Sequence, residues 1–187
     1  MKNIVYLISI ALFIIHLSSC KSSTSLFIDN YNWQIGGDAG WQFDQSEIIG
    51  ESDGGAGFIM TSDSYDDFIL ELDFRPDNSV NSGVFIRCEN HEMSPISCYE
   101  INIWDNHSNQ DFRTGAVVMK SKPLAKVNTT NKWNTYKIKA KGSSIQAWIN
   151  NTKVADITDQ DRPSGFIGLQ AAENGIVKFK NVKIKVL

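Results

Sequence analysis

Several features that mark common protein classes are scarce in this sequence. Three cysteines among 187 residues are too few for a disulfide-dense scaffold or for a metal site of four thiolates. Thirteen glycines and four prolines exclude a collagen-like or low-complexity chain. Eighteen lysines and arginines against 21 acidic residues give a net charge of −3, so no overall basic field attracts nucleic acid or anionic lipid. What is present, 42% hydrophobic and 11% aromatic residues, suffices for one domain with a sizeable core.

The first apolar run predicts an export signal. Residues 4–17 contain only two strongly polar members. The run is too short to cross a bilayer core, which takes about 20 residues, and it is typical of a signal peptide. It ends in Leu17-Ser18-Ser19-Cys20, which resembles the box at which bacterial lipoproteins are cleaved and acylated. We therefore expect a signal peptide over 1–19 and an acylated tether over 20–25. The alternative is an ordinary secretory signal with an incidental Cys20.

An acylated Cys20 implies a membrane partner and a location in the cell envelope. Residue 21 is Lys rather than the Asp that retains enterobacterial lipoproteins in the inner membrane, and no acidic surface-export tag follows. We therefore expect an outer-membrane lipoprotein that faces the periplasm, with surface display as the alternative.

From residue 26 onward, apolar and polar residues alternate as in half-buried β-strands, and no window carries a capped helical stripe. The pattern predicts an all-β, antiparallel fold, either a two-sheet sandwich or a jelly roll, that forms a single domain over 26–187. Two long polar segments, 89–97 and 105–113, are expected to be loops that carry binding groups. The expected strands are 47–50, 57–62, 66–75, 82–88, 98–104, 114–119, 133–140, 144–149, 153–157, 165–171 and 175–187.

The two cysteines that remain after acylation of Cys20 flank the first of these loops. Cys88 ends one expected strand and Cys98 begins the next. In an oxidising compartment a disulfide between them would persist, and it would stabilise the fold by roughly 2–3 kcal/mol for a loop of this size. The alternative is a pair of buried free thiols.

A series of short motifs along these strands resembles one known family, the 3-keto-disaccharide hydrolase domain family. The resemblance covers nearly the whole chain after residue 26 and implies a concanavalin-like or laminin-G-like jelly roll. In order, the motifs are Asn81-Ser82-Gly83-Val84-Phe85-Ile86-Arg87, Tyr99-Glu100-Ile101-Asn102-Ile103-Trp104-Asp105-Asn106-His107, Thr114-Gly115-Ala116, Trp133-Asn134-Thr135-Tyr136, Trp148-Ile149-Asn150, Gly168-Leu169-Gln170 and Val177-Lys178-Phe179-Lys180-Asn181-Val182-Lys183-Ile184.

Two positions depart from the family pattern and bear on substrate preference. Asn102 stands where the family usually has Gln, and Val118 occupies a region in which the family often carries an aromatic residue.

The resemblance implies an enzyme that cleaves glycosides already oxidised to a ketone at C3. The ketone acidifies the C2 proton, so a base can remove it, the aglycone can leave from C1 by elimination, and water can then add back. This route needs a base, a group that stabilises the enolate oxygen and an acid for the leaving oxygen. It does not need the paired carboxylates of ordinary glycosidases.

The candidate site centres on one strand, because Glu100, Asn102 and Trp104 share a face by the period of 2. We expect Glu100 to be the general base; the alternatives are a substrate-binding role or a position on a solvated sheet face. Asn102, Trp104 and Gln170 are expected to bind the sugar.

Three further residues complete the predicted catalytic set. Arg87 would hold the developing enolate or a sugar hydroxyl, or else pair with Glu89 or Asp105 as a structural residue. His107 would protonate the leaving oxygen, unless it is an exposed loop residue. Asp105 is the next candidate, and together with His107 it could hold a divalent cation, although the metal requirement stays unknown.

The disulfide and the catalytic set conflict if the hairpin is regular. Cysteines paired directly across an antiparallel hairpin would place residue 86 opposite Glu100 and Arg87 opposite Tyr99, so Arg87 and Glu100 would lie on opposite faces. A bulge would shift this register. A missing disulfide would remove the conflict, and otherwise only one of the two residues belongs to the site.

Two acidic groups have a structural and a functional interpretation. Glu71 and Asp73 share a strand face, where a solvated surface with a local ion pair is favoured over a pair of glycosidase carboxylates. Asp63, Asp66 and Asp67 precede a strand, where a turn is favoured over calcium ligation.

Two functions from different classes therefore remain. One is an enzyme that acts on 3-keto-glycosides; the other is a lipid-anchored carbohydrate-binding module without turnover. Carbohydrate is the expected partner in both cases, and nucleic acid is not.

Overall fold

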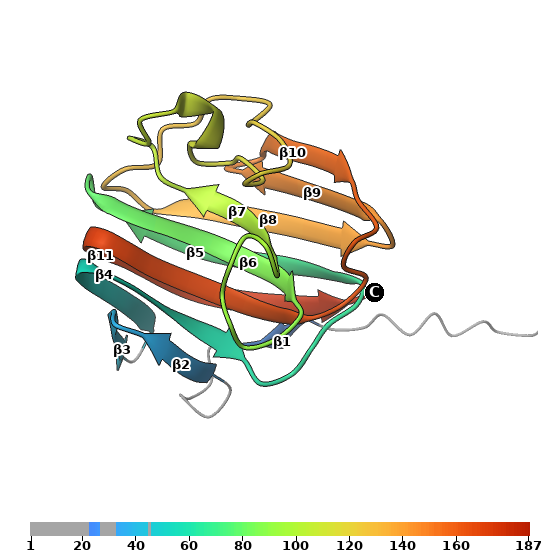
Figure 1. Cartoon of the computed structure of the whole chain (residues 1–187), viewed down its shortest axis with the longest axis horizontal. Helices are drawn as coiled ribbons and strands as arrows, with labels where there is room; N and C mark the ends of the chain where they lie inside the picture. The colour runs from blue at the N-terminus through green and yellow to red at the C-terminus, as the bar shows by residue number, and fades with distance from the viewer. Residues whose placement is uncertain (1–22, 27–32, 45) are drawn as a thin grey trace, which may run out of the picture.

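The computed structural model describes residues 23–26, 33–44 and 46–187, which form an all-β domain (Figure 1). The predicted signal peptide and Cys20 lie outside the described residues. No described segment forms a helix long and apolar enough to span a membrane. The elements are β1 (Thr24–Ser25), β2 (Trp33–Gly37), β3 (Gly40–Asp44), β4 (Glu47–Thr61), β5 (Phe68–Pro76), β6 (Val80–Cys88), β7 (Tyr99–Ile103), the 3₁₀ helix η2 (Gln110–Phe112), β8 (Asn134–Lys141), β9 (Ser144–Ile149), β10 (Thr152–Thr158) and β11 (Phe166–Val186).

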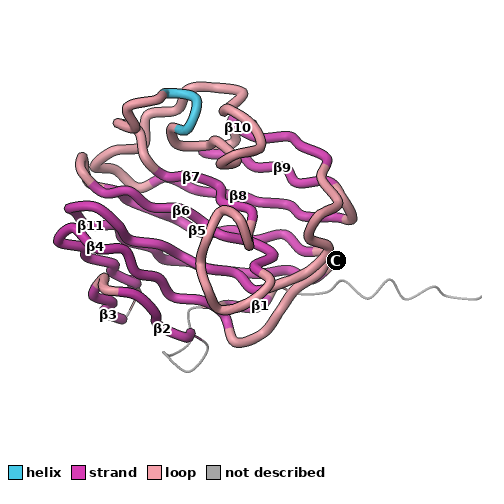
Figure 2. Tube along the Cα trace, in the orientation of Figure 1, coloured by secondary structure: helices cyan, strands magenta, loops and turns pink. Residues whose placement is uncertain are grey.

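The strands form one antiparallel hydrogen-bonded sheet that folds over itself into two layers (Figure 2). Two long strands, β4 and β11, run through both layers. The first half of β11 pairs with β6, and its second half pairs with β5. The front layer of Figure 1 contains β7, β6 and the first half of β11, and the back layer contains β10, β9, β8, β5 and the second half of β11. The predicted jelly-roll class is confirmed, and β4 and β11 join its two sheets into one.

The core lies between the layers and follows the alternation of the sequence. Every second residue of β5 is buried there, as are the alternate residues of β6, β7 and β8. Within the back layer, Phe74 of β5 packs against Tyr136 of β8, with ring centroids 5.1 Å apart. The Tyr136 hydroxyl donates to the carbonyl oxygen of Asn102 on the opposite layer, at 3.3 Å. The same alternation directs the polar residues of each strand to the two outer faces.

Cys88 and Cys98 form a disulfide, and a bulge beside it sets the register of the hairpin. Arg87 has a φ of 52°, which lies in the left-handed region. Before this residue the pairing is Phe85 opposite Glu100 and Ile86 opposite Tyr99, one position away from the register of a regular hairpin closed at the cysteines. The bulge therefore allows the disulfide and shifts Glu100 relative to β6.

The strand prediction needs three corrections. Segment 114–119 is not a strand, because Gly115 and Met119 have φ values of 92° and 64°. The segment lies beside β7 and is joined to it by backbone hydrogen bonds that do not form a regular ladder. The predicted breaks after residues 50 and 171 do not occur, because β4 and β11 continue through bends with register shifts in β11. Strands β1, β2 and β3 are not predicted by the alternation.

Candidate functional site

The outer face of the front layer carries a row of site residues because paired antiparallel residues share a face. Gly83 of β6 lies between Asn102 of β7 and Gln170 of β11. The next row toward the disulfide places Phe85 beside Glu100. A Cβ at Gly83 would lie 3.2 Å from both Cγ and Oε1 of Glu100, which is closer than ordinary van der Waals contact. The missing side chain leaves space beside the carboxylate.

A pocket of about 220 Å³ opens on this face at β7. It combines a carboxylate, an imidazole, two amides and aromatic walls, which is the composition of a sugar site. Its lining residues are Asn81, Glu100, Asn102, Trp104, His107, Phe112, Val118 and Met119.

Glu100 is the ionisable residue best placed for proton transfer. Its exposed fraction is 7%, and no group of the described residues donates a hydrogen bond to its carboxylate. Burial raises the pKa of Glu100 to about 7 because the charged form loses its hydration. A carboxyl group with such a pKa accepts and returns a proton near neutral pH.

His107 is held against the aromatic wall of the pocket. Its ring makes edge contacts with Trp104 and Phe112, at centroid distances of 4.4 and 5.6 Å. The backbone N–H of Asn109 donates to Nδ1 at 3.0 Å, so the neutral ring carries its proton on Nε2. His107 is therefore a fixed ring with a donor available to a ligand.

Asn102 lies in the pocket wall, and its amide is used within the protein. Nδ2 donates to the carbonyl oxygen of Phe112, and Oδ1 accepts from the N–H of Ile103 at 2.9 Å. The side chain thus ties the loop that carries Phe112 to β7.

The comparison with protein families identifies the family of the chain. The family described as the 3-keto-alpha-glucoside-1,2-lyase-like domain matches residues 23–185. The chain belongs to this family.

Solved structures share the fold of this family member. A candidate glycosyl hydrolase from Parabacteroides distasonis ATCC 8503 is 24% identical, with a TM-score of 0.74, and the match covers 89% of this chain and 100% of that chain. A second one from the same organism is 22% identical, with a TM-score of 0.77 and coverage of 88% and 94%. The carbohydrate-binding module CBM66 from Bacillus subtilis is 20% identical, with a TM-score of 0.63 and coverage of 82% and 95%. No curated protein sequence matches the chain.

The structure does not bring Arg87 to the pocket, which corrects its predicted place beside Glu100. The bulge turns its guanidinium into the protein, where it is completely buried. It donates to the carbonyl oxygens of Asp66, Gly142 and Arg162 and contacts the carboxylate of Asp67 at 3.3 Å. In this family member Arg87 is a structural residue that joins three loops.

Asp105 is also directed away from the pocket. Its carboxylate accepts from the backbone N–H and hydroxyl groups of Thr129 and Thr130 and lies 3.4 Å from the Arg113 guanidinium. Burial would raise the pKa of Asp105, but hydrogen bonds from Thr114 and Thr129 and the charge of Arg113 lower it overall. Asp105 fixes the start of the loop that carries His107.

Gln170 lies beside the pocket, across Gly83 from Asn102, but it does not line the cavity. Its Oε1 is buried and has no hydrogen-bond partner among the described residues. Because this oxygen is buried and does not open onto the cavity, the structure does not bring Gln170 to the pocket as a sugar-binding residue.

Metal ligation has no support from the positions of the predicted acidic residues. Within the described ranges, no three His, Cys, Asp or Glu side chains gather as metal ligands. The Asp105 carboxylate already binds the two threonines and Arg113. The Asp67 carboxylate accepts hydrogen bonds from the Gly142 N–H and from Arg87. Glu71 pairs with Lys137 at 3.2 Å on the opposite outer face.

Three pocket residues, Asn81, Phe112 and Met119, were not among the predicted site residues. In the sequence, Asn81 stands in the first family motif without a sign of its role. Its place near Trp104 follows from the β6–β7 register, which the bulge at Arg87 sets. Phe112 and Met119 come from the irregular segment after β7, where no periodicity points to a face. Val118 lines the pocket at the position where an aromatic residue was expected.

Proposed function

We propose that this protein cleaves 3-keto-glycosides by elimination, with Glu100 as the general base. The observation that carries the proposal is the carboxylate of Glu100, which is nearly buried, lacks a donor among the described residues and has a pKa near 7. These properties suit a group that removes a weakly acidic C–H proton at neutral pH. Family membership supplies the substrate class.

The proposed cleavage begins with the loss of the proton on C2. Glu100 takes the proton from C2, and the electron pair forms an enolate with its charge on the C3 oxygen. The C3 ketone then forms again as the pair makes a C1–C2 double bond and the C1–O bond breaks. Nε2 of His107 donates its proton to the departing aglycone oxygen. Water then adds across the C1–C2 double bond: its hydroxyl joins C1 and its proton restores Nε2 of His107. Glu100 returns a proton to C2, which completes the free 3-keto-sugar.

The enolate oxygen needs a donor, and Asn81 takes this role in place of Arg87. The Asn81 side chain lines the pocket and has no hydrogen-bond partner among the described residues. Its amide can donate to the developing charge on the C3 oxygen. Trp104 offers a flat apolar surface to the sugar ring.

The test is turnover of a 3-keto-glucoside in deuterium oxide, followed by release of the aglycone and by the isotope at C2 of the product. We expect aglycone release with deuterium at C2. Cleavage in which C2 of every product molecule carries only the original hydrogen would contradict a base that exchanges its proton with the solvent.

A second candidate function is carbohydrate binding without turnover, which the likeness to the module from Bacillus subtilis favours. Binding of the 3-keto-glucoside without any aglycone release would select it.

The location is a separate proposal. We propose that Cys20 is acylated and anchors the domain to the outer membrane on its periplasmic side. The motif Leu17-Ser18-Ser19-Cys20 supports this, together with the Lys that follows it.

A further inference from the structure

The outer face of the back layer, opposite the Glu100 pocket, gathers positive charge from strands that are distant in sequence. Alternation on β5, β8, β10 and the second half of β11 directs nine cationic side chains to this surface, which we call the basic face. They are half of the 18 lysines and arginines of a chain whose net charge is −3. The nine are Arg75, Lys137, Lys139, Lys141, Lys153, Lys178, Lys180, Lys183 and Lys185.

Carboxylates on the same strands do not neutralise this charge. Glu71 pairs with Lys137 at 3.2 Å, and Asp156 pairs with Lys153 at 2.7 Å. The third carboxylate on these strands, that of Asp73, accepts hydrogen bonds from the uncharged side chains of Thr135 and Asn181. Within the described part of the chain, six cations of the basic face form no ion pair: Arg75, Lys139, Lys141, Lys180, Lys183 and Lys185.

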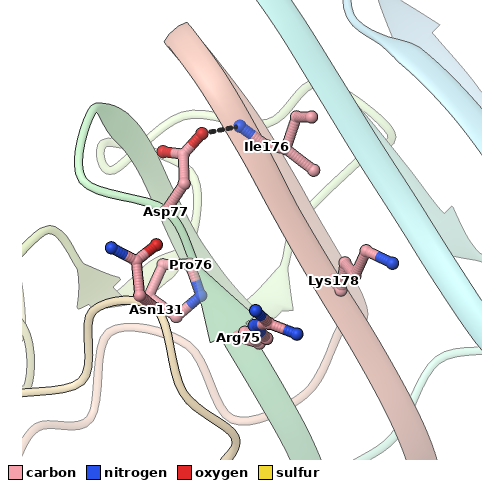
Figure 3. Close-up of a pocket in the computed structure, with 6 residues that line it drawn as sticks. All are labelled: Arg75, Pro76, Asp77, Asn131, Ile176 and Lys178. Carbon is pink, nitrogen blue, oxygen red and sulfur yellow. Dashed lines mark hydrogen bonds between the residues drawn. The ribbon is translucent and has the colours of Figure 1, made fainter.

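One end of the basic face places two cations directly opposite each other. Arg75 of β5 is paired in register with Lys178 of β11, and both line a pocket of about 300 Å³ (Figure 3). Like charges at directly opposed positions destabilise a sheet. Lys178 is balanced by Glu47 at 2.9 Å, whereas Arg75 forms no ion pair within the described part of the chain. An anion bound here would relieve the repulsion.

The middle of the basic face holds a hollow of about 470 Å³ with the features of a glycan platform. Trp148 is half-buried in its wall, with Lys137 and Lys139 on the neighbouring strand and Gln146 two residues before it. An indole ring on a sheet surface offers an apolar plane to a sugar ring, while ammonium and amide groups bind carboxylates and hydroxyls. The Lys153 ammonium lies over the Trp148 ring, 5.3 Å from its centroid, so a sugar that stacks on this face displaces Lys153, whose charge can then pair with a carboxylate of the ligand. The remaining lining residues are Ile69, Thr135 and Asn151.

We propose that the basic face binds an acidic polysaccharide, whose sugar rings lie on Trp148 and whose carboxylates pair with Lys137 and Lys139. The positive charge of the basic face favours an anionic ligand, and the recessed indole ring favours a sugar polymer. A bilayer would be met by protruding apolar side chains, whereas here the ring is bordered by lysine and amide groups. This site is separate from the Glu100 pocket.

The test is calorimetric titration of the detergent-solubilised full chain with tetragalacturonate and with maltotetraose at low ionic strength. We expect binding of the uronate that weakens with added salt, and at least tenfold weaker binding of the neutral glycan. Lys137→Gln/Lys139→Gln should lower the affinity for tetragalacturonate at least tenfold. Lys122→Gln/Lys126→Gln makes the same charge change on an exposed loop and should change the affinity less than twofold.

Trp148 provides the second arm of the test. Trp148→Ala should weaken tetragalacturonate binding about tenfold, and Trp148→Phe, which keeps a ring, about threefold. Three results would overturn the proposal. The first is equal binding of the two tetrasaccharides, and the second is an equal loss of affinity in the two double-lysine variants. The third is binding of phosphatidylglycerol vesicles or of an oligonucleotide that is tighter than binding of tetragalacturonate and that Trp148→Ala leaves unchanged. Glu100→Gln should bind tetragalacturonate normally, so failure here leaves the proposed cleavage untouched.

Discussion

Replacement of Glu100 by Gln should abolish turnover and at the same time stabilise the protein at alkaline pH. Gln keeps the size of the side chain but has no charge to bury and cannot take a proton from carbon. Loss of a general base costs about 10²–10⁴ in rate. The gain in stability reports the burial of the charge, and the loss of turnover reports the role of the carboxylate in the reaction.

The size of the stability effect follows from the pKa of Glu100. The folded state raises it from 4.5 to about 7. Below pH 4.5 the carboxyl group is protonated in both the folded and the unfolded state, so burial costs nothing extra. Between pH 4.5 and 7 only the folded state keeps the proton, and the free energy of unfolding falls as pH rises. At 1.36 kcal/mol per pH unit, the total loss by pH 8 is about 3 kcal/mol.

The assay is urea unfolding of wild type and Glu100→Gln from pH 4 to pH 8.5. We expect the difference in unfolding free energy, variant minus wild type, to grow by about 3 kcal/mol over this range. The matched control is Glu51→Gln, an exposed carboxylate for which the difference should stay within about 0.5 kcal/mol. A pH-independent difference for Glu100→Gln would show that the carboxylate is well solvated, and the argument for the base would lose its support.

Four further predictions concern residues at and away from the pocket. Arg87→Met should lower the unfolding free energy by about 3 kcal/mol, because it leaves three carbonyl oxygens without their donor, but it should keep kcat/KM when assayed below its melting temperature; a folded variant that is inactive would return Arg87 to catalysis. His107→Gln should slow release of an alkyl aglycone about 10²-fold and of p-nitrophenol less than tenfold, since p-nitrophenolate leaves without an acid; equal losses would remove His107 as the acid. In unreduced native protein Cys88 and Cys98 should resist alkylation, and reduction should lower the unfolding free energy by roughly 2–3 kcal/mol; rapid labelling of both thiols would contradict this. Cys20→Ser should move the protein from the membrane to the soluble fraction, and continued membrane association after a high-salt wash would refute acylation.

The sequence by itself determined the class of fold and the centre of the site. Side chains alternate along every strand, so the period of 2 is a local property that can be detected without knowing the partners. The alternation indicated a two-sheet sandwich or a jelly roll, and the family motifs selected the jelly roll. The alternation also placed Glu100, Asn102 and Trp104 together on one face, as the structure has them. The same reasoning missed the bends of β4 and β11, because a bent strand and two short strands have the same local pattern.

Only the tertiary structure decided which side chains meet across strands. A single left-handed residue, Arg87, shifts the β6–β7 register, so it joins Asn81 to the pocket and buries its own guanidinium elsewhere. The basic face likewise depends on β8, β5 and β11 lying side by side, although their lysines are visible in the sequence. Strand order and register are fixed by contacts between residues that are far apart in the chain, and the backbone preferences of neighbouring residues do not encode them.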